Sequence, residues 1–129
     1  MLKHPRFPRS FGQLALATSL AIAFLPAFAA DFPVGTYLAD GSKTSVKFEK
    51  GEFAVEDAQK TVVTGKYTVK ANQIQITDKD GPWACTKDGE QTGTYRWKYE
   101  DSVLTFEKVT DACKDRVGSM VAVKWKQQH

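Results

Sequence analysis

The sequence predicts a small all-β protein, an antiparallel up-and-down barrel of about eight strands. Three observations lead to this prediction. Apolar and polar residues alternate in short runs, turn residues separate these runs, and no stretch after the first thirty residues shows a sustained 3.6-residue apolar period. Regular short strands of this kind are typical of sandwiches and barrels. Closing the sheet on itself also removes its two edges, which are aggregation hazards.

Each expected element follows from local patterning. Gly65 lies inside the fourth expected strand, where a glycine usually marks a bulge or a sharp bend. Residues 83–86 form either a short strand or an irregular segment. Residues 111–118 predict a short helical turn, with Asp111 as its cap. The strands are expected at 32–38, 46–49, 52–56, 61–70, 74–77, 91–99, 104–106 and 121–126.

One unit of the sequence occurs twice, 28 residues apart. Gly-x-Tyr at 65–67 returns at 93–95, and Ala-Cys at 84–85 returns at 112–113. Residues 35–37 supply a third Gly-x-Tyr, and a turn and an apolar-x-apolar strand follow each copy. A repeat of this kind builds a meander from hairpins. The alternative is that a small β protein reuses Gly and Tyr by chance.

The first thirty residues have the pattern of a secretory signal peptide. Lys3, Arg6 and Arg9 give a basic start, residues 14–28 are almost wholly apolar, and small residues follow at 27–29. This order of regions is typical of an export signal. The alternative, a membrane anchor, requires about 20 apolar residues, and this run is shorter. We therefore expect cleavage after Ala29 or Ala30, with a single domain at 31–129 that is exported to the periplasm or the cell exterior.

Charge in the expected mature domain is balanced. Three of the 18 Lys and Arg residues, and none of the 15 Asp and Glu residues, lie in the leader. The mature domain thus carries no net charge and no basic cluster. We expect a monomer that binds neither nucleic acid nor, once the leader is removed, a membrane.

The two cysteines, Cys85 and Cys113, most simply form one disulfide in an exported chain. The alternatives are a redox pair or a metal site. Redox pairs usually stand as C-x-x-C, and a metal site needs more ligands than His129, the single mature histidine, could supply. We expect a structural disulfide, no metal and no cofactor.

The mature chain resembles the calycins, the lipocalin-like barrels. The likeness lies in Gly35 and Tyr37 at its start, where calycins have Gly-x-Trp, and in Lys124 or Lys126 on the last strand as the basic partner. Residues 93–97, 104–106 and 111–116 also look like a largely uncharacterised group of small secreted bacterial proteins. The resemblance implies a barrel that binds a small molecule.

Catalysis is the least favoured class. His129 lies at a terminus expected to fray, so the serines have no histidine partner within reach. The carboxylates are expected in turns or on outward strand faces, which favours a solvated surface over a glycosidase-like pair. Asp78-x-Asp80-Gly81 resembles part of a calcium loop but lacks the other ligands, so a turn is expected.

Two non-catalytic functions remain. The first is binding of a small, partly apolar ligand inside the barrel, although an interior this narrow can also be filled by its own side chains. A tyrosine there could hydrogen-bond a ligand headgroup, a water or another tyrosine. The candidate interior residues are Phe48, Tyr67, Tyr95, Trp97, Tyr99, Phe106 and Trp125.

The second is a protein-interaction module, such as an inhibitor of a periplasmic hydrolase or a component of an envelope complex. Its candidate surface is the turn-rich loop 78–89, with Trp83 among Pro, Gly and charged residues. A tryptophan there is either a recognition anchor or a lid over the barrel mouth. Because Trp83 lies two residues before Cys85, we expect it to be tucked against the disulfide.

Overall fold

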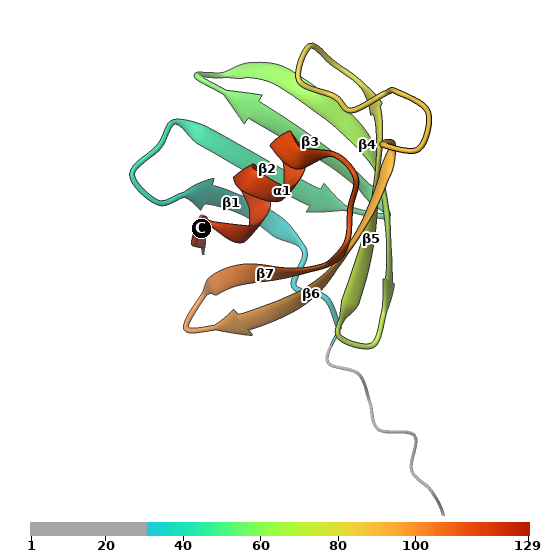
Figure 1. Cartoon of the computed structure of the whole chain (residues 1–129). Helices are drawn as coiled ribbons and strands as arrows, with labels where there is room; N and C mark the ends of the chain where they lie inside the picture. Colours follow the sequence, from blue (N-terminus) through green and yellow to red (C-terminus); the bar gives the residue numbers. More distant parts are fainter. Residues whose placement is uncertain (1–30) are drawn as a thin grey trace, which may run out of the picture.

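Eight antiparallel strands close into one barrel in residues 31–129, the part of the chain that the computed structural model describes (Figure 1). Each strand pairs with the next, and the last pairs with the first, as the sequence predicted. The expected signal peptide at 1–30 lies outside the described residues. The strands are β1 (Gly35–Ala39), β2 (Thr44–Glu49), β3 (Glu52–Asp57), β4 (Lys60–Lys70), β5 (Gln73–Asp80), β6 (Thr92–Glu100), β7 (Val103–Thr110) and β8 (Trp125–Gln127).

A bulge in β4 lies where the glycine predicted it. The pairing of β4 with β5 shifts register between Thr64 and Gly65. A Cβ atom at Gly65 would stand 2.1 Å from the carbonyl oxygen of Thr77 and 2.6 Å from the ring of Phe53. Only glycine allows the neighbouring strand and ring to approach this closely, so the sharp curvature of the barrel here depends on it.

Each of the three Gly-x-Tyr units lies on the first strand of a hairpin. They begin or lie in β1, β4 and β6, and each of these strands forms a hairpin with the strand that follows it. Tyr37 lies opposite Val46, and Tyr67 lies opposite Ile76. All three tyrosines of the units are buried. The repeated residues therefore mark the first strand of three hairpins.

The segment after β7 differs from the prediction. Helix α1 (Lys114–Val121) has Cys113 as its N-cap, not Asp111, and Val121 belongs to the helix. The last strand is shorter than expected and begins only at Trp125. The reason is that the Asp111 carboxylate is bound to Arg116 and Tyr95, so it does not cap the helix. The early part of the first expected strand also stays outside the sheet, which begins at Gly35.

One end of the barrel is filled by aromatic rings, and we call it the closed end. The ring of Phe32, which precedes β1, lies 5.1 Å from that of Phe48, 5.6 Å from that of Tyr67 and 5.3 Å from that of Trp97. Edge-to-face and tilted pairs at these distances are favourable. Phe32 thus plugs the barrel on the side from which the chain enters.

The basic partner that the calycin resemblance implied lies elsewhere. Gln127, not a lysine, stands opposite Tyr37 in the pairing of β1 with β8. Lys126 extends to the surface, where its ammonium lies 3.1 Å from a carboxylate oxygen of Asp40, and Lys124 is exposed. The Tyr37 hydroxyl donates to the carbonyl of Pro33 at 2.5 Å.

Candidate functional site

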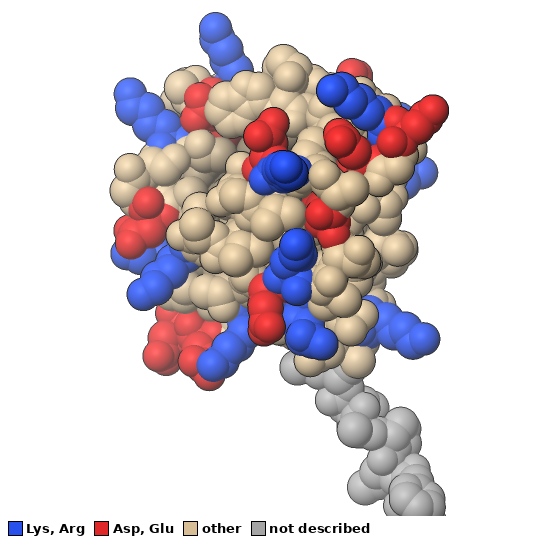
Figure 2. Space-filling model, in the orientation of Figure 1, with Lys and Arg blue, Asp and Glu red and all other residues tan. Residues whose placement is uncertain are grey.

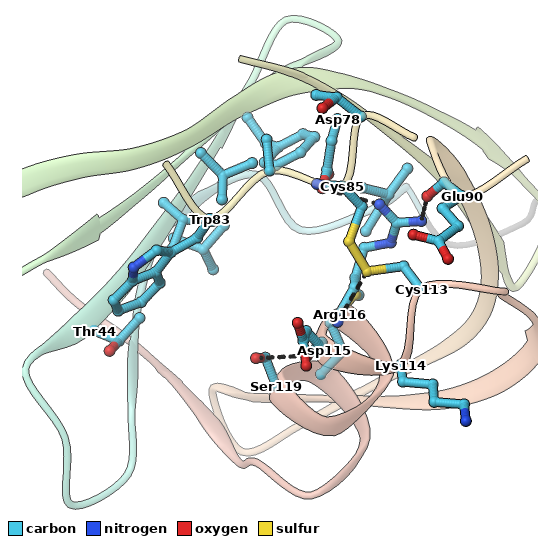
Figure 3. Close-up of a pocket in the computed structure, with 18 of the residues that line it drawn as sticks. Thr44, Asp78, Trp83, Cys85, Glu90, Cys113, Lys114, Asp115, Arg116 and Ser119 are labelled. Carbon is cyan, nitrogen blue, oxygen red and sulfur yellow. Dashed lines mark hydrogen bonds and ion pairs between the residues drawn. A yellow bond between two sulfur atoms is a disulfide. The ribbon is translucent and has the colours of Figure 1, made fainter. Parts of the chain in front are cut away.

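A cavity of about 900 Å³ occupies the other end of the barrel, which we call the open end (Figure 3). Helix α1 lies over this end in Figure 1, and the loop 81–91 completes its rim. Thr44, Lys87, Asp115 and Ser119 are the polar and charged residues toward the solvent. The apolar side chains of the wall come from six strands and the helix: Val46, Phe48, Phe53, Val55, Val63, Ile76, Phe106, Met120 and Trp125.

The predicted interior residues divide between the two ends. Three of the seven, Phe48, Phe106 and Trp125, line the cavity. The other four do not line it. Tyr67 and Trp97 pack on Phe32 at the closed end. Tyr95 and Tyr99 are engaged by hydrogen bonds.

The hydroxyls of those two tyrosines have protein partners. Tyr95 donates to the carboxylate of Asp111, and Tyr99 donates to the side-chain oxygen of Gln127. Burial and the hydrogen bond to Asp111 raise the pKa of Tyr95 well above its usual value. Burial, followed by the effect of Tyr99, raises the pKa of Tyr37 to about 12. These hydroxyls serve the fold, and none of them lines the cavity.

Trp83 lies at the cavity mouth and is not tucked against the disulfide, so that expectation was wrong. It is 54% exposed. Figure 3 shows it across the cavity from the Cys85–Cys113 bond, with Thr44 beside it. Its backbone N–H donates to the carbonyl of Val62 at 3.0 Å, which holds the loop against β4. The space beside the disulfide is taken by Arg116 instead.

Arg116 is the centre of a buried ionic cluster in the cavity wall. The exposed fractions of the side chains are 7% for Arg116, 4% for Asp78 and 0% for Asp111. The Arg116 Nε donates to Asp111 Oδ2 at 2.7 Å, and Nη2 donates to Asp111 Oδ1 at 2.8 Å. Nη1 lies 3.0 Å from Asp78 Oδ2. The remaining donors reach the carbonyls of Glu90 and Gln91, so the guanidinium is fully engaged.

The same two aspartates hold the disulfide. The Cys85–Cys113 bond is present, as the sequence predicted. Asp78 Oδ2 accepts the backbone N–H of Cys85 at 2.8 Å, and Asp111 Oδ1 accepts that of Cys113 at 2.9 Å. The bond and the cluster thereby join the loop 81–91 to helix α1. The irregular loop and the short helix therefore form a fixed rim for the cavity.

The cluster determines the charge states of its members. Burial alone would raise the pKa of Asp111, but the hydrogen bonds from Arg116 and Tyr95 outweigh burial and hold the pKa below its usual value. Burial would likewise lower the pKa of Arg116, but the Asp111 hydrogen bond and the two carboxylate charges raise it. Arg116 and Asp111 are therefore a charged pair at neutral pH.

The burial of Asp78 and Asp111 corrects the expectation that every carboxylate is solvated. Asp78 lies on β5, not in the expected turn. A signal for Asp111 was present in the sequence, because Asp111 and Arg116 lie only five residues apart, on either side of the Cys113 N-cap. Gly93 also contributes, since a Cβ there would stand 2.3 Å from Asp111 Oδ2. No comparable local pattern indicates Asp78.

The described lining contains no histidine, and both of its cysteines are joined in the disulfide. The Ser119 hydroxyl donates to the carbonyl of Asp115 at 2.9 Å, within its own helix. Within residues 31–129 no group of three His, Cys, Asp or Glu side chains is placed to hold a metal ion. The helix in this same range is neither long nor apolar enough to cross a membrane.

Charged side chains are mixed on the face that carries the open end. Figure 2 shows Lys and Arg interspersed with Asp and Glu across this face. A surface of mixed sign produces no extended field of one sign.

Comparison with known proteins gives no match to the chain, whether to a family model, a curated sequence or a solved structure.

Proposed function

We propose that the protein is a non-catalytic binding protein that holds a small, partly apolar molecule in the cavity at the open end. The observation that carries this proposal is the cavity of about 900 Å³ with nine apolar side chains in its wall. Small-molecule sites typically have volumes of about 300–1,000 Å³, mostly apolar walls and a few polar groups. Phe32, Tyr67 and Trp97 pack together at the closed end and leave this space open.

Three further features are consistent with a calycin-like carrier that acts outside the cytoplasm. The closed meander of eight antiparallel strands is the architecture that the resemblance implied. The disulfide fits an oxidising compartment such as the periplasm. The pattern of residues 1–30 supplies the export signal. Fold resemblance alone does not identify a function, so the proposal depends on the cavity.

The three tryptophans provide a built-in test. Trp125 lines the cavity, Trp83 lies at its mouth and Trp97 packs at the closed end. Protein labelled with ¹⁵N in its tryptophans gives three indole N–H signals. Titration with decanol is expected to shift the Trp125 and Trp83 signals and to leave the Trp97 signal in place.

Native mass spectrometry of protein recovered from its own export compartment gives the natural ligand. We expect an added mass that is lost on denaturation. An unliganded mass, together with a decanol titration that moves none of the three indole signals, would overturn the proposal.

The exposure of Trp83 favours a second candidate, a protein-interaction module that acts through the loop 78–89. Exposed tryptophans are frequent anchors of protein interfaces. Such a partner would be a periplasmic hydrolase or a component of an envelope complex. Crosslinking in the export compartment is expected to capture one protein with the native chain and not with Trp83→Ala. Equal capture by both would remove this candidate.

A further inference from the structure

We infer that the ligand carries a hydrogen-bond donor, best of all a protonated amine, which binds the Asp78 carboxylate in the cavity wall. This inference deepens the proposed function and rests on it. It names the chemical class of the ligand, an apolar molecule with one cationic or donor group. Three observations lead to it: the charge of the ionic cluster, the unused oxygen of Asp78, and the lack of any free cation in the inner wall.

The ionic cluster is unbalanced. It contains two carboxylates, Asp78 and Asp111, and one guanidinium, Arg116, all at least nine-tenths buried. Buried charges are stable when they are paired and hydrogen-bonded. One negative charge in the cluster has no counterpart among the described residues around it. A ligand that brings a positive charge to this wall would supply it.

Asp78 and Asp111 differ in how their oxygens are used. Both oxygens of Asp111 accept hydrogen bonds, Oδ1 from Cys113 and Arg116, and Oδ2 from Tyr95 and Arg116. Asp78 Oδ2 accepts from Cys85 and pairs with Arg116, whereas no donor within residues 31–129 reaches its Oδ1. Asp78 lines the cavity, and Asp111 does not. The unused acceptor oxygen is therefore on Asp78, which a ligand in the cavity can reach.

In residues 31–129 the inner wall has no free cationic group for an anion, and the Trp125 indole N–H, a buried donor without a hydrogen-bond partner, is uncharged. The donors of Arg116 are all engaged, as described above. Lys87 and Lys114 also line the cavity, but both side chains are exposed to solvent. Exposed charges interact weakly because water screens them. The headgroup of a carboxylate ligand would lie beside the excess negative charge of the ionic cluster, so the binding of such a ligand is disfavoured.

Three probes with the same ten-carbon alkyl chain distinguish a cationic, a neutral and an anionic headgroup: decylammonium, decanol and decanoate. Their affinities for the oxidised protein can be measured by isothermal titration calorimetry at pH 7. A charge-assisted hydrogen bond is about twice as strong as a neutral one. We expect decylammonium to bind at least about tenfold more tightly than decanol, which corresponds to about 1.4 kcal/mol, and decanoate to bind most weakly.

Substitution Asp78→Asn should remove the preference, so that decylammonium and decanol bind within about threefold of each other. Asp115→Asn is the matched control. It also removes one negative charge from the cavity lining, but Asp115 is exposed on α1. This control should retain the full preference. Retention of the preference in Asp78→Asn would overturn the assignment to Asp78.

A measurement on the native protein covers the case in which Asp78→Asn does not fold. The Cys85 amide donates to Asp78, and the Cys113 amide donates to Asp111. Decylammonium should shift the Cys85 amide signal more than decanol does and affect the Cys113 amide less. Equal affinity for all three probes, or tightest binding of decanoate, overturns the inference and leaves the proposed function standing. Binding of none of them overturns both.

Discussion

The closed and open ends of the barrel are held together by different forces. At the closed end Phe32, Phe48, Tyr67 and Trp97 pack ring against ring, and their stability comes from burial and dispersion. At the open end the rim is fixed by a disulfide and an ionic cluster, and the space between the rim segments is a cavity. One half of the interior is filled by side chains, and the other is enclosed by covalent and polar links.

This difference indicates how a barrel domain of about a hundred residues, 31–129, can keep a cavity. A barrel of eight strands has an interior just wide enough for its own side chains or one small ligand. The packed rings of Phe32, Tyr67 and Trp97 provide a core at the closed end. Polar and covalent links then hold the other end in place without filling it. The two ends can therefore be perturbed separately.

The largest effect is expected from the ionic cluster. Asp111→Asn removes one partner of a buried charged pair, so we expect a loss of about 3–5 kcal/mol in the free energy of unfolding. Chemical denaturation at pH 7 measures it. Asp115→Asn, a change of the same charge at an exposed position, is the control and should alter stability by less than about 0.5 kcal/mol. Equal losses in the two variants would contradict the role given to the cluster.

The same carboxylate predicts an acid sensitivity. The pKa of Asp111 is lower in the folded protein than the usual value of 3.8. Its contribution to stability is therefore complete above that value and is lost as the pH falls through the lower, folded-state pKa. Unfolding measured between pH 7 and pH 2 should show this loss in the native protein and less of it in Asp111→Asn. Parallel curves for the two proteins would exclude Asp111 as a source of the acid sensitivity.

Removing the disulfide should loosen the open end. The bond closes a loop of about 29 residues, so Cys85→Ala with Cys113→Ala should lower the free energy of unfolding by about 3–4 kcal/mol. Under native conditions amide hydrogen exchange should accelerate in α1 and the loop 81–91 and remain slow around Trp97. Uniform acceleration throughout the barrel would show that the two ends are not separable.

Phe32→Ala tests the closed end. Removing a buried phenylalanine ring should cost about 3 kcal/mol, because it leaves a cavity among the remaining rings. Val34→Ala in the same segment is the control, since Val34 is exposed. Decanol affinity should be unchanged in Phe32→Ala under conditions where the variant is folded. A large loss of affinity would mean that the plug also shapes the binding cavity.

Trp83→Ala should have the smallest effect on stability, below about 0.5 kcal/mol, because the side chain is largely exposed. It should nevertheless weaken decanol binding about fivefold, corresponding to one aromatic contact of about 1 kcal/mol. Calorimetry measures both quantities. Unchanged affinity would place Trp83 outside the ligand site and would strengthen the case for a protein partner.

Much of the fold was predictable from local patterns. Alternation predicted the strands because each strand has one face toward the interior, and the turn residues placed the hairpins. Gly65 predicted the bulge, and two cysteines in a chain expected to be exported predicted the bond between Cys85 and Cys113. The predicted start of the helix was wrong because the Asp111 carboxylate, a good capping group, binds Arg116 and Tyr95 instead.

The sequence by itself determined the strands, their order and the disulfide, since these depend on neighbouring residues and on pairs with no competing partner. Only the tertiary structure decided which end of the barrel each aromatic ring fills. Alternation shows that a side chain points inward, but it does not give its height along the barrel axis. The burial of Asp78 beside Arg116 and the exposure of Trp83 were likewise decided by contacts between segments far apart in the chain. The cavity exists because of those contacts.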